Sequence, residues 1–195
     1  QLTHRLMDER EGAFAHDWLA RVNHPGSQHT YELRGGKLPR RPPTVSAKDI
    51  GPGKVFSGPT WEVSAAVAEH AQPWLDSLAY RIDSDEGSIV VTGDTRPCDS
   101  VRELARGADV MLCCCWDDQE RMAERAEVAA RELGGICGTT EAGEMAQDAE
   151  VKKLVLVHTG AYISEPVHME KGVGDIRRVY DGEVVFSREL MSLTV

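Results

Sequence analysis

A short apolar segment that runs directly into a carboxylate is the feature that most constrains the fold of this sequence. Residues 88–94 read Ser-Ile-Val-Val-Thr-Gly-Asp. This β-branched run predicts a strand buried within a sheet. A surface turn would account for Gly93, but it would require neither so apolar a strand nor Asp94 at its mouth.

Strand-like and helix-like segments alternate from this point to the C-terminus. Buried strands are predicted over residues 108–115 and 152–158, and helices over 99–106, 117–133, 139–149 and 168–175, with Thr139 or Thr140 capping the third helix. Three hairpins are also predicted: 54–58 with 61–70, 77–83 with 88–94, and a closing hairpin over 176–190 with its turn at Asp181-Gly182. The fold class is therefore α/β or α+β, with a mixed sheet covered by helices.

The first 53 residues differ from the rest of the chain. Residues 2–22 carry apolar side chains at helical spacing, which predicts an amphipathic helix. Residues 23–53 are rich in Gly, Pro and polar side chains and predict a long loop or an insertion. We therefore expect one region over residues 1–53 and a second, sheet-forming region over residues 54–195.

Charge and composition narrow the function. The net charge of −10 argues against a domain that binds nucleic acid through clustered Lys and Arg. The sequence holds no stretch of about 18 apolar residues, so no membrane span is expected. Five cysteines, three of them consecutive, do not suit a disulfide framework and favour a reducing cytoplasm. Because the chain begins at Gln1 rather than Met, we expect a piece of a longer protein.

Three predicted strands end on a residue that can bind a metal ion. These residues are His70, Asp94 and His158. Taken singly, a histidine at a strand end is usually a polar terminus and Gly-Asp is usually a turn, and the chain has no HxH, HExxH or CxxC motif. Together, imidazole and carboxylate groups suit Zn²⁺, Mn²⁺ or Fe, and a carboxylate can bridge two ions.

The cysteine triplet has a simpler interpretation. Successive side chains of a strand point to opposite faces, so Cys113 and Cys115 share one face and Cys114 takes the other. Free cysteine behaves as a small buried hydrophobe, which is the interpretation we favour over a metal site or a nucleophile.

At these residues the chain resembles the C-terminal half of the metallo-β-lactamase fold superfamily, in its ribonuclease Z-like branch. The stretches that carry the resemblance are residues 68–82, 90–112, 138–160 and 179–187. The resemblance implies an αββα sandwich, here lacking the N-terminal half with its HxHxDH motif. It also implies that His70 binds one metal ion, that His158 binds the other, and that Asp94 bridges them.

The function implied by the resemblance is that of a dinuclear hydrolase. Two ions, zinc with Mn or Fe as alternatives, would activate a bridging water against a small ester, lactone, amide or phosphoester. With HxHxDH absent, three ligands at most remain, so this chain alone is expected to bind metal poorly and to hydrolyse little. The alternative is a catalytically incomplete fragment or a binding and assembly module, whose open sheet face pairs with the missing half or with a second copy in a homodimer.

The chain also departs from the ribonuclease Z-like pattern around the site. Cys113 and Cys114 stand where that branch carries a His-Glu pair, and Ile136-Cys137 stand where it carries a histidine. With the negative net charge, this makes a nucleic-acid substrate unlikely and a small-molecule substrate the better expectation. Candidates for the cleft wall, each more often structural than functional, are Thr95, Trp116, Asp117, Cys137 and His168.

Overall fold

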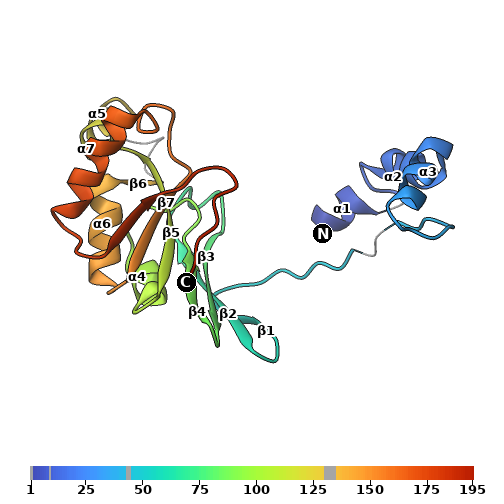
Figure 1. Ribbon diagram of the computed structural model, residues 1–195, viewed down its shortest axis with the longest axis horizontal. Coiled ribbons are helices and arrows are strands. Elements are labelled where there is room, and N and C mark those ends of the chain that lie inside the picture. The colour runs from blue at the N-terminus through green and yellow to red at the C-terminus, as the bar shows by residue number, and fades with distance from the viewer. Residues whose placement is uncertain (1, 9, 43–44, 130–134) are drawn as a thin grey trace. The chain divides into compact units, whose positions relative to one another are not determined.

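The computed structural model describes residues 2–8, 10–42, 45–129 and 135–195. The chain forms two compact units, Gln1–Asp49 and Ile50–Val195, which are described separately (Figure 1). Among the described residues, no helix combines the length and the apolar character that crossing a bilayer would need.

The described residues of the first unit form helices α1 (Leu2–Met7), α2 (Ala15–Asn23) and α3 (Pro25–Leu33). The predicted single helix over residues 2–22 is wrong, because the Asp8 carboxylate accepts the backbone N–H groups of Arg10 and Glu11 and so ends α1 in a turn. The predicted loop over residues 23–53 is wrong between Pro25 and Leu33. Proline at the first position of α3 is compatible with a helix start because its missing N–H would have no partner there.

The second unit is built on one mixed sheet. Its strands are β1 (Gly53–Ser57), β2 (Trp61–Ala68), β3 (Ser77–Ser84), β4 (Gly87–Val91), β5 (Val110–Asp117), β6 (Cys137–Gly138), β7 (Lys153–Val157) and β8 (Glu183–Phe186). They lie in the order β1-β2-β3-β4-β5-β7-β8, with the short β6 beside β5. The β1–β2, β2–β3 and β3–β4 pairs are antiparallel, and the pairs from β4 onward are parallel. The predicted mixed sheet and its first two hairpins are confirmed.

Four helices connect the later strands: α4 (Asp99–Ala105), α5 (Gln119–Ala129), α6 (Thr139–Asp148) and α7 (Pro166–Arg177). The predicted closing hairpin is wrong, because α7 extends to Arg177 and β8 then pairs in parallel with β7. The predicted cap of α6 is also wrong, since the chain enters that helix at Gly138, whose N–H donates to the Glu141 carboxylate. The predicted end of α5, residues 130–133, lies outside the described residues.

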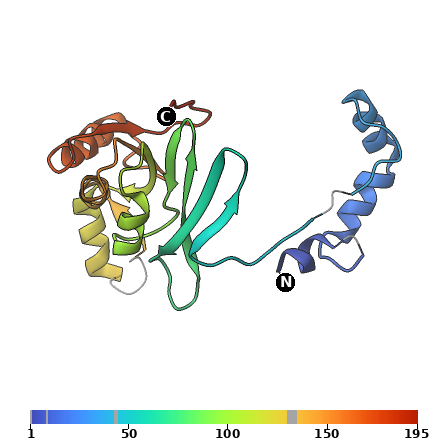
Figure 2. The same ribbon diagram turned by 90° about the horizontal axis from the view of Figure 1, so that it is seen from below.

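Helices α4 to α7 gather on one side of the sheet (Figure 2). Alternate strand residues face them and are fully buried, among them Met111, Cys113, Cys115, Leu154 and Leu156. The interpretation of Cys113 and Cys115 as buried hydrophobes is thus confirmed, and burial raises the pKa of Cys115 well above its ordinary value.

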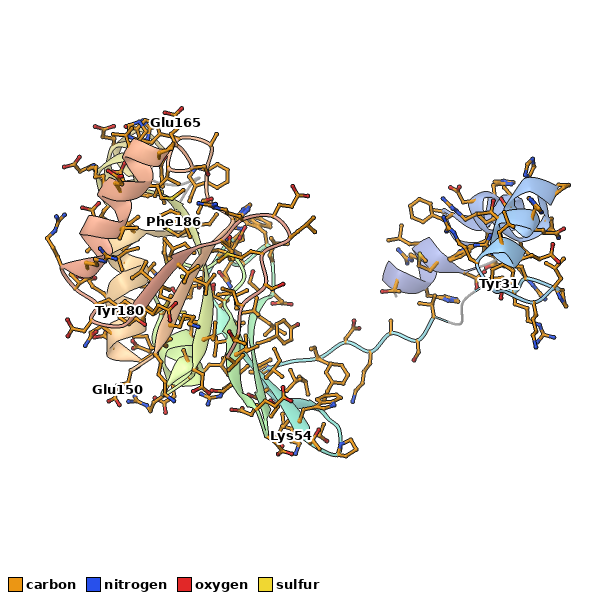
Figure 3. The ribbon with its side chains drawn as sticks, in the orientation of Figure 1. Tyr31, Lys54, Glu150, Glu165, Tyr180 and Phe186 are labelled. Atoms are coloured by element: carbon orange, nitrogen blue, oxygen red, sulfur yellow. The ribbon has the colours of Figure 1, made fainter. Side chains whose placement is uncertain are left out.

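The C-terminal part of the chain closes this core. Tyr180 and Phe186, both labelled in Figure 3, pack against the helix-covered core. The Tyr180 hydroxyl donates a 2.9 Å hydrogen bond to the carbonyl of Val151, which lies two residues before β7. Burial raises the pKa of Tyr180 to about 12.

A carboxylate fastens the sheet edge that lies opposite the candidate ligands. Asp109 Oδ1 accepts a 2.6 Å hydrogen bond from Lys152 Nζ, and its Oδ2 accepts the backbone and hydroxyl hydrogens of Ser88 at 2.8 and 2.9 Å. The hydrogen bond from Lys152 first, and then those from Ser88, lower the pKa of Asp109 to about 2 from its ordinary 3.8.

We expect Asp109→Asn to reduce the free energy of unfolding in a pH-dependent way. A depressed carboxyl pKa stabilises the folded state above the unfolded-state pKa, and that contribution disappears as the pH falls through the folded-state pKa. The difference between wild type and variant should be constant above about pH 5 and shrink between about pH 4 and pH 2. Urea unfolding across this range measures it, with the exposed Asp181→Asn as control. A difference that does not change with pH would contradict the assignment.

Candidate metal centre

The candidate ligands reach one edge of the sheet because of its strand directions. Strand β3 is antiparallel to both β2 and β4, so β2 runs in the same direction as β4, β5 and β7. The carboxyl ends of these four strands therefore share one edge. His70 lies two residues beyond β2, Asp94 lies three beyond β4, and His158 directly follows β7.

The three side chains meet at the Asp94 carboxylate. Its Oδ2 lies 3.8 Å from His70 Nε2, and its Oδ1 lies 3.7 Å from His158 Nε2. These separations are too long for hydrogen bonds. They are close to the spacing of two donors around one ion, because metal–ligand bonds of about 2.0–2.2 Å place donors at a tetrahedral angle about 3.4 Å apart.

The two oxygens of Asp94 are divided between the two imidazoles, since Oδ2 faces His70 and Oδ1 faces His158. A carboxylate that bridges two ions would present its oxygens in this way. In the described part of the chain, no group of three or more His, Cys, Asp or Glu side chains that could hold a metal ion is found. The three candidate ligands therefore form two donor pairs that share Asp94.

A backbone carbonyl fixes the orientation of His70. Its Nδ1 lies 2.8 Å from the carbonyl oxygen of Gly135. A carbonyl can only accept, so Nδ1 carries a proton, and in the neutral ring the lone pair then lies on Nε2, on the side of Asp94. A methyl group at position 135 would collide with the ring, which explains the glycine there.

The other two ligands stand on tightly bent backbone. His158 has φ of +54°, a left-handed conformation that strains a residue with a side chain, and Gly93 before Asp94 has φ of +60°. The His158 ring meets the ring of Trp116 edge-on, with centroids 5.4 Å apart. The N–H of Gly160 donates to the carbonyl of Trp116 at 2.7 Å, which ties the segment after His158 to the end of β5.

Cys114 lies beside Asp94 on the face of the sheet away from the helices. Burial, followed by the negative charge of Asp94, raises the pKa of the Cys114 thiol to about 12. The thiol therefore stays protonated at neutral pH. In the ribonuclease Z-like pattern a glutamate is expected at this position, so the structure puts a neutral group where the resemblance implies a charged one.

The five side chains predicted to line a cleft lie in different surroundings. Thr95, Asp117 and Cys137 are almost completely buried, and a contact with substrate stays a prediction for them. Asp117 pairs with Arg121 at 3.0 Å. His168 stacks on Tyr162 with centroids 3.6 Å apart, which is a packing role. The Trp116 ring contacts the candidate ligand His158.

Sequence reasoning missed two groups that act on the site. Gly135 belongs to a Gly-Gly pair after a charged segment, and nothing in that pattern marks its carbonyl as the acceptor for His70. Glu69 precedes His70, and its main-chain groups both bond to the segment that follows Asp94. Such main-chain partners leave no signature in side-chain type.

Comparison with known proteins places these observations in a family. Residues 13–159 match the family model described as the beta-lactamase superfamily domain. Ribonuclease Z of Mycobacterium tuberculosis H37Rv is 28% identical over 155 residues, covering 75% of this chain and 49% of that protein. Ribonuclease Z of Methanosarcina acetivorans is 33% identical over 108 residues, covering 55% of this chain and 32% of that protein. The chain thus spans about half the length of the curated relatives from mycobacteria.

Solved structures show the same fold. The metallo-beta-lactamase fold protein YhfI from Bacillus subtilis aligns with a TM-score of 0.55 at 23% identity, covering 69% of this chain and 49% of that one. Zn(2+)-bound PqqB from Methylobacterium extorquens aligns with a TM-score of 0.53 at 16% identity, covering 88% of this chain and 63% of that one. Human tRNase Z, short form, aligns with a TM-score of 0.51 at 19% identity, covering 85% of this chain and 61% of that one. With the family model matching most of its length, this chain belongs to the beta-lactamase superfamily, with relatives in the ribonuclease Z-like branch.

Proposed function

We propose that this chain supplies the bridging half of the metal centre of a metal-dependent hydrolase. The observation that carries the proposal is the division of the Asp94 oxygens between His70 and His158. Zinc suits imidazole and carboxylate donors, with Mn and Fe as alternatives. When bound, two such ions act as Lewis acids and lower the pKa of a water between them.

The residues of this chain prepare that site in three ways. Asp94 brings the negative charge that balances two cations. The carbonyl of Gly135 selects the tautomer of neutral His70 that carries its lone pair on Nε2, and it aims Nε2 at Asp94. The ring of Trp116 limits the movement of His158.

We propose a phosphoester as the substrate, a class that includes the phosphodiesters of nucleic acid. The expectation that nucleic acid is unlikely has lost its support, since the curated relatives are named for a ribonuclease. Its physical premise was also too coarse. Residues 1–49 carry eight Lys and Arg against six Asp and Glu, so the acidity of the chain resides in the second unit and not in the first.

A second candidate is a small ester, lactone or amide with a good leaving group. The observation that favours it is the buried Cys114, which stands where the ribonuclease Z-like pattern carries a glutamate. A buried thiol does not take the place of a carboxylate as an acid–base group. A substrate whose leaving group departs without being protonated would not need the acid–base pair that this chain lacks.

The first test is metal binding. We expect the chain to bind Co²⁺, used as a spectroscopic stand-in for zinc, and Asp94→Ala to weaken binding by at least about tenfold because both ions lose an oxygen donor. Absorption titration of the metal-free chain measures the affinity. The exposed Asp181→Ala is the control and should bind as wild type does. Equal Co²⁺ affinity in wild type and Asp94→Ala would overturn the assignment.

The second test separates the two substrate classes. The chain is loaded with Zn²⁺ or Mn²⁺ and assayed at high protein concentration, since each ion has few protein donors, with bis-p-nitrophenyl phosphate and with p-nitrophenyl acetate. We expect the phosphodiester to be hydrolysed and Asp94→Ala to remove this activity. Hydrolysis of the acetate alone, with the same dependence on Asp94, would favour the second candidate.

A third test addresses the orientation of His70. Gly135→Ala should push the imidazole away from the carbonyl and remove the fixed Nδ1–H tautomer, because the added methyl occupies the place of the ring. Long-range ¹H–¹⁵N NMR of the histidine side chains reports the tautomer directly. Gly174→Ala in α7 is the matched control, as an added methyl meets no atom within 4 Å there. An unchanged His70 signal in Gly135→Ala would show that the carbonyl does not hold the ring.

A further inference from the structure

The sheet alone does not explain why His70 and Asp94 meet. They follow β2 and β4, and β3 lies between those strands. Strands separated by one neighbour lie about 9–10 Å apart. His70 Nε2 is nevertheless 3.8 Å from Asp94 Oδ2, so the two chain segments must bend toward each other beyond the sheet.

They do so in the space that β3 leaves open. Strand β3 begins at Ser77, which pairs with Ala68, so Glu69 has no partner on β3. Glu69 instead forms an isolated antiparallel bridge with Arg96, and the Arg96 N–H donates to the Glu69 carbonyl at 2.9 Å. The segments that carry His70 and Asp94 therefore pair directly with each other.

A side chain completes this pairing. The Thr95 hydroxyl oxygen accepts the N–H of Glu69 at 3.0 Å, and its hydrogen is donated to the Arg96 carbonyl at 2.8 Å. Both main-chain groups of Glu69 are thus bound to residues 95 and 96. The contact joins the residue before His70 to the residue after Asp94.

We define the Thr95 clamp as Thr95 with its hydrogen bonds to Glu69 and Arg96. A neighbouring buried segment supports it. Thr95 is fully buried. The buried Cys137 thiol donates to its carbonyl at 3.2 Å, and the nearby Gly135 carbonyl accepts from His70. One short segment, residues 135–137, therefore steadies both the clamp and the histidine. Threonine suits this place because its β-branched side chain has few rotamers.

We propose that Thr95 is a positioning residue that sets the separation of His70 and Asp94. The proposal deepens the proposed function and rests on it where metal is concerned, since the separation matters because both side chains are to hold one ion. Displacing a ligand by about 1 Å is enough to spoil a preorganised site. Without the hydroxyl, the Glu69 N–H loses its acceptor, and the end of β2 is tied to the segment after Asp94 only by the bonds between Arg96 and Glu69.

A purely structural role for Thr95 makes different predictions from a positioning role. Thr95→Val keeps the shape and removes the hydroxyl, whereas Thr95→Ser keeps the hydroxyl and removes a methyl group. Thr139→Val is the matched control. Thr139 is equally buried and also uses its hydroxyl twice, but these two hydrogen bonds reach Gln119 and Asp175 and not the candidate ligands.

The experiment measures Co²⁺ affinity by absorption titration and the unfolding midpoint of the same chains. We expect Thr95→Val to weaken Co²⁺ binding by at least about tenfold, and Thr95→Ser to stay within about twofold of wild type. Thr139→Val should lower the unfolding midpoint and leave Co²⁺ affinity unchanged. The clamp is overturned if Thr95→Val binds Co²⁺ as well as Thr139→Val does, or if Thr95→Ser is as weak as Thr95→Val.

A second readout needs no metal and separates the clamp from the proposed function. In the metal-free chain, the ring ¹⁵N signals of His70 should shift in Thr95→Val and stay in place in Thr95→Ser and Thr139→Val. If wild type binds no Co²⁺, the proposed function fails, and these signals still decide the clamp. If they do not shift in Thr95→Val, the clamp is overturned whatever the metal result.

Discussion

A single carboxylate organises the edge of the sheet where the candidate ligands lie. Asp94 stands between two imidazoles, and each of its oxygens faces a different one. The two histidines follow β2 and β7, which lie on opposite sides of β4. Each segment must therefore bend past the strand that separates it from β4 to bring its imidazole to Asp94. The positive φ values at Gly93 and His158 show where the backbone makes these bends. The geometry of the site therefore depends on what holds the strand ends together.

The sequence allowed the strands and their ends to be predicted, because apolar runs and the polar residues that stop them are local signals. The hairpin partners of β1 to β4 followed from the same alternation. The prediction of a closing hairpin was wrong because Asp181-Gly182, a common hairpin turn, here joins a helix to a parallel strand. The pairing of that strand with β7 depends on tertiary contacts that the local sequence does not show. Helix α3 was not predicted because the Gly and Pro residues in 23–53 suggested a loop, although Pro25 only marks a helix start.

For the site, the sequence allowed the convergence of three side chains to be predicted, but not the groups that support them. Residue type marks His70, Asp94 and His158 as possible metal donors, and strand order brings them to one edge. Thr95 and Cys137 are candidates for the cleft wall in the sequence, each more often structural than functional. Both are buried and act on main-chain groups, a role that depends on burial and register and that residue type does not reveal.

The hydrogen bonds at the end of β2 have a consequence for the rim of the site. Glu69, the residue before His70, is bonded to the segment after Asp94 before the chain enters the turn that leads to β3. The Gln72 side chain, which bonds to the backbone of Ala68 and His70, closes that turn at its base. Beyond it, Trp74 is 87% exposed and Leu75 is 54% exposed. Changes of length or side chain at this tip would alter the exposed surface beside the candidate metal centre, and they would leave the hydrogen bonds of Glu69 to residues 95 and 96 intact.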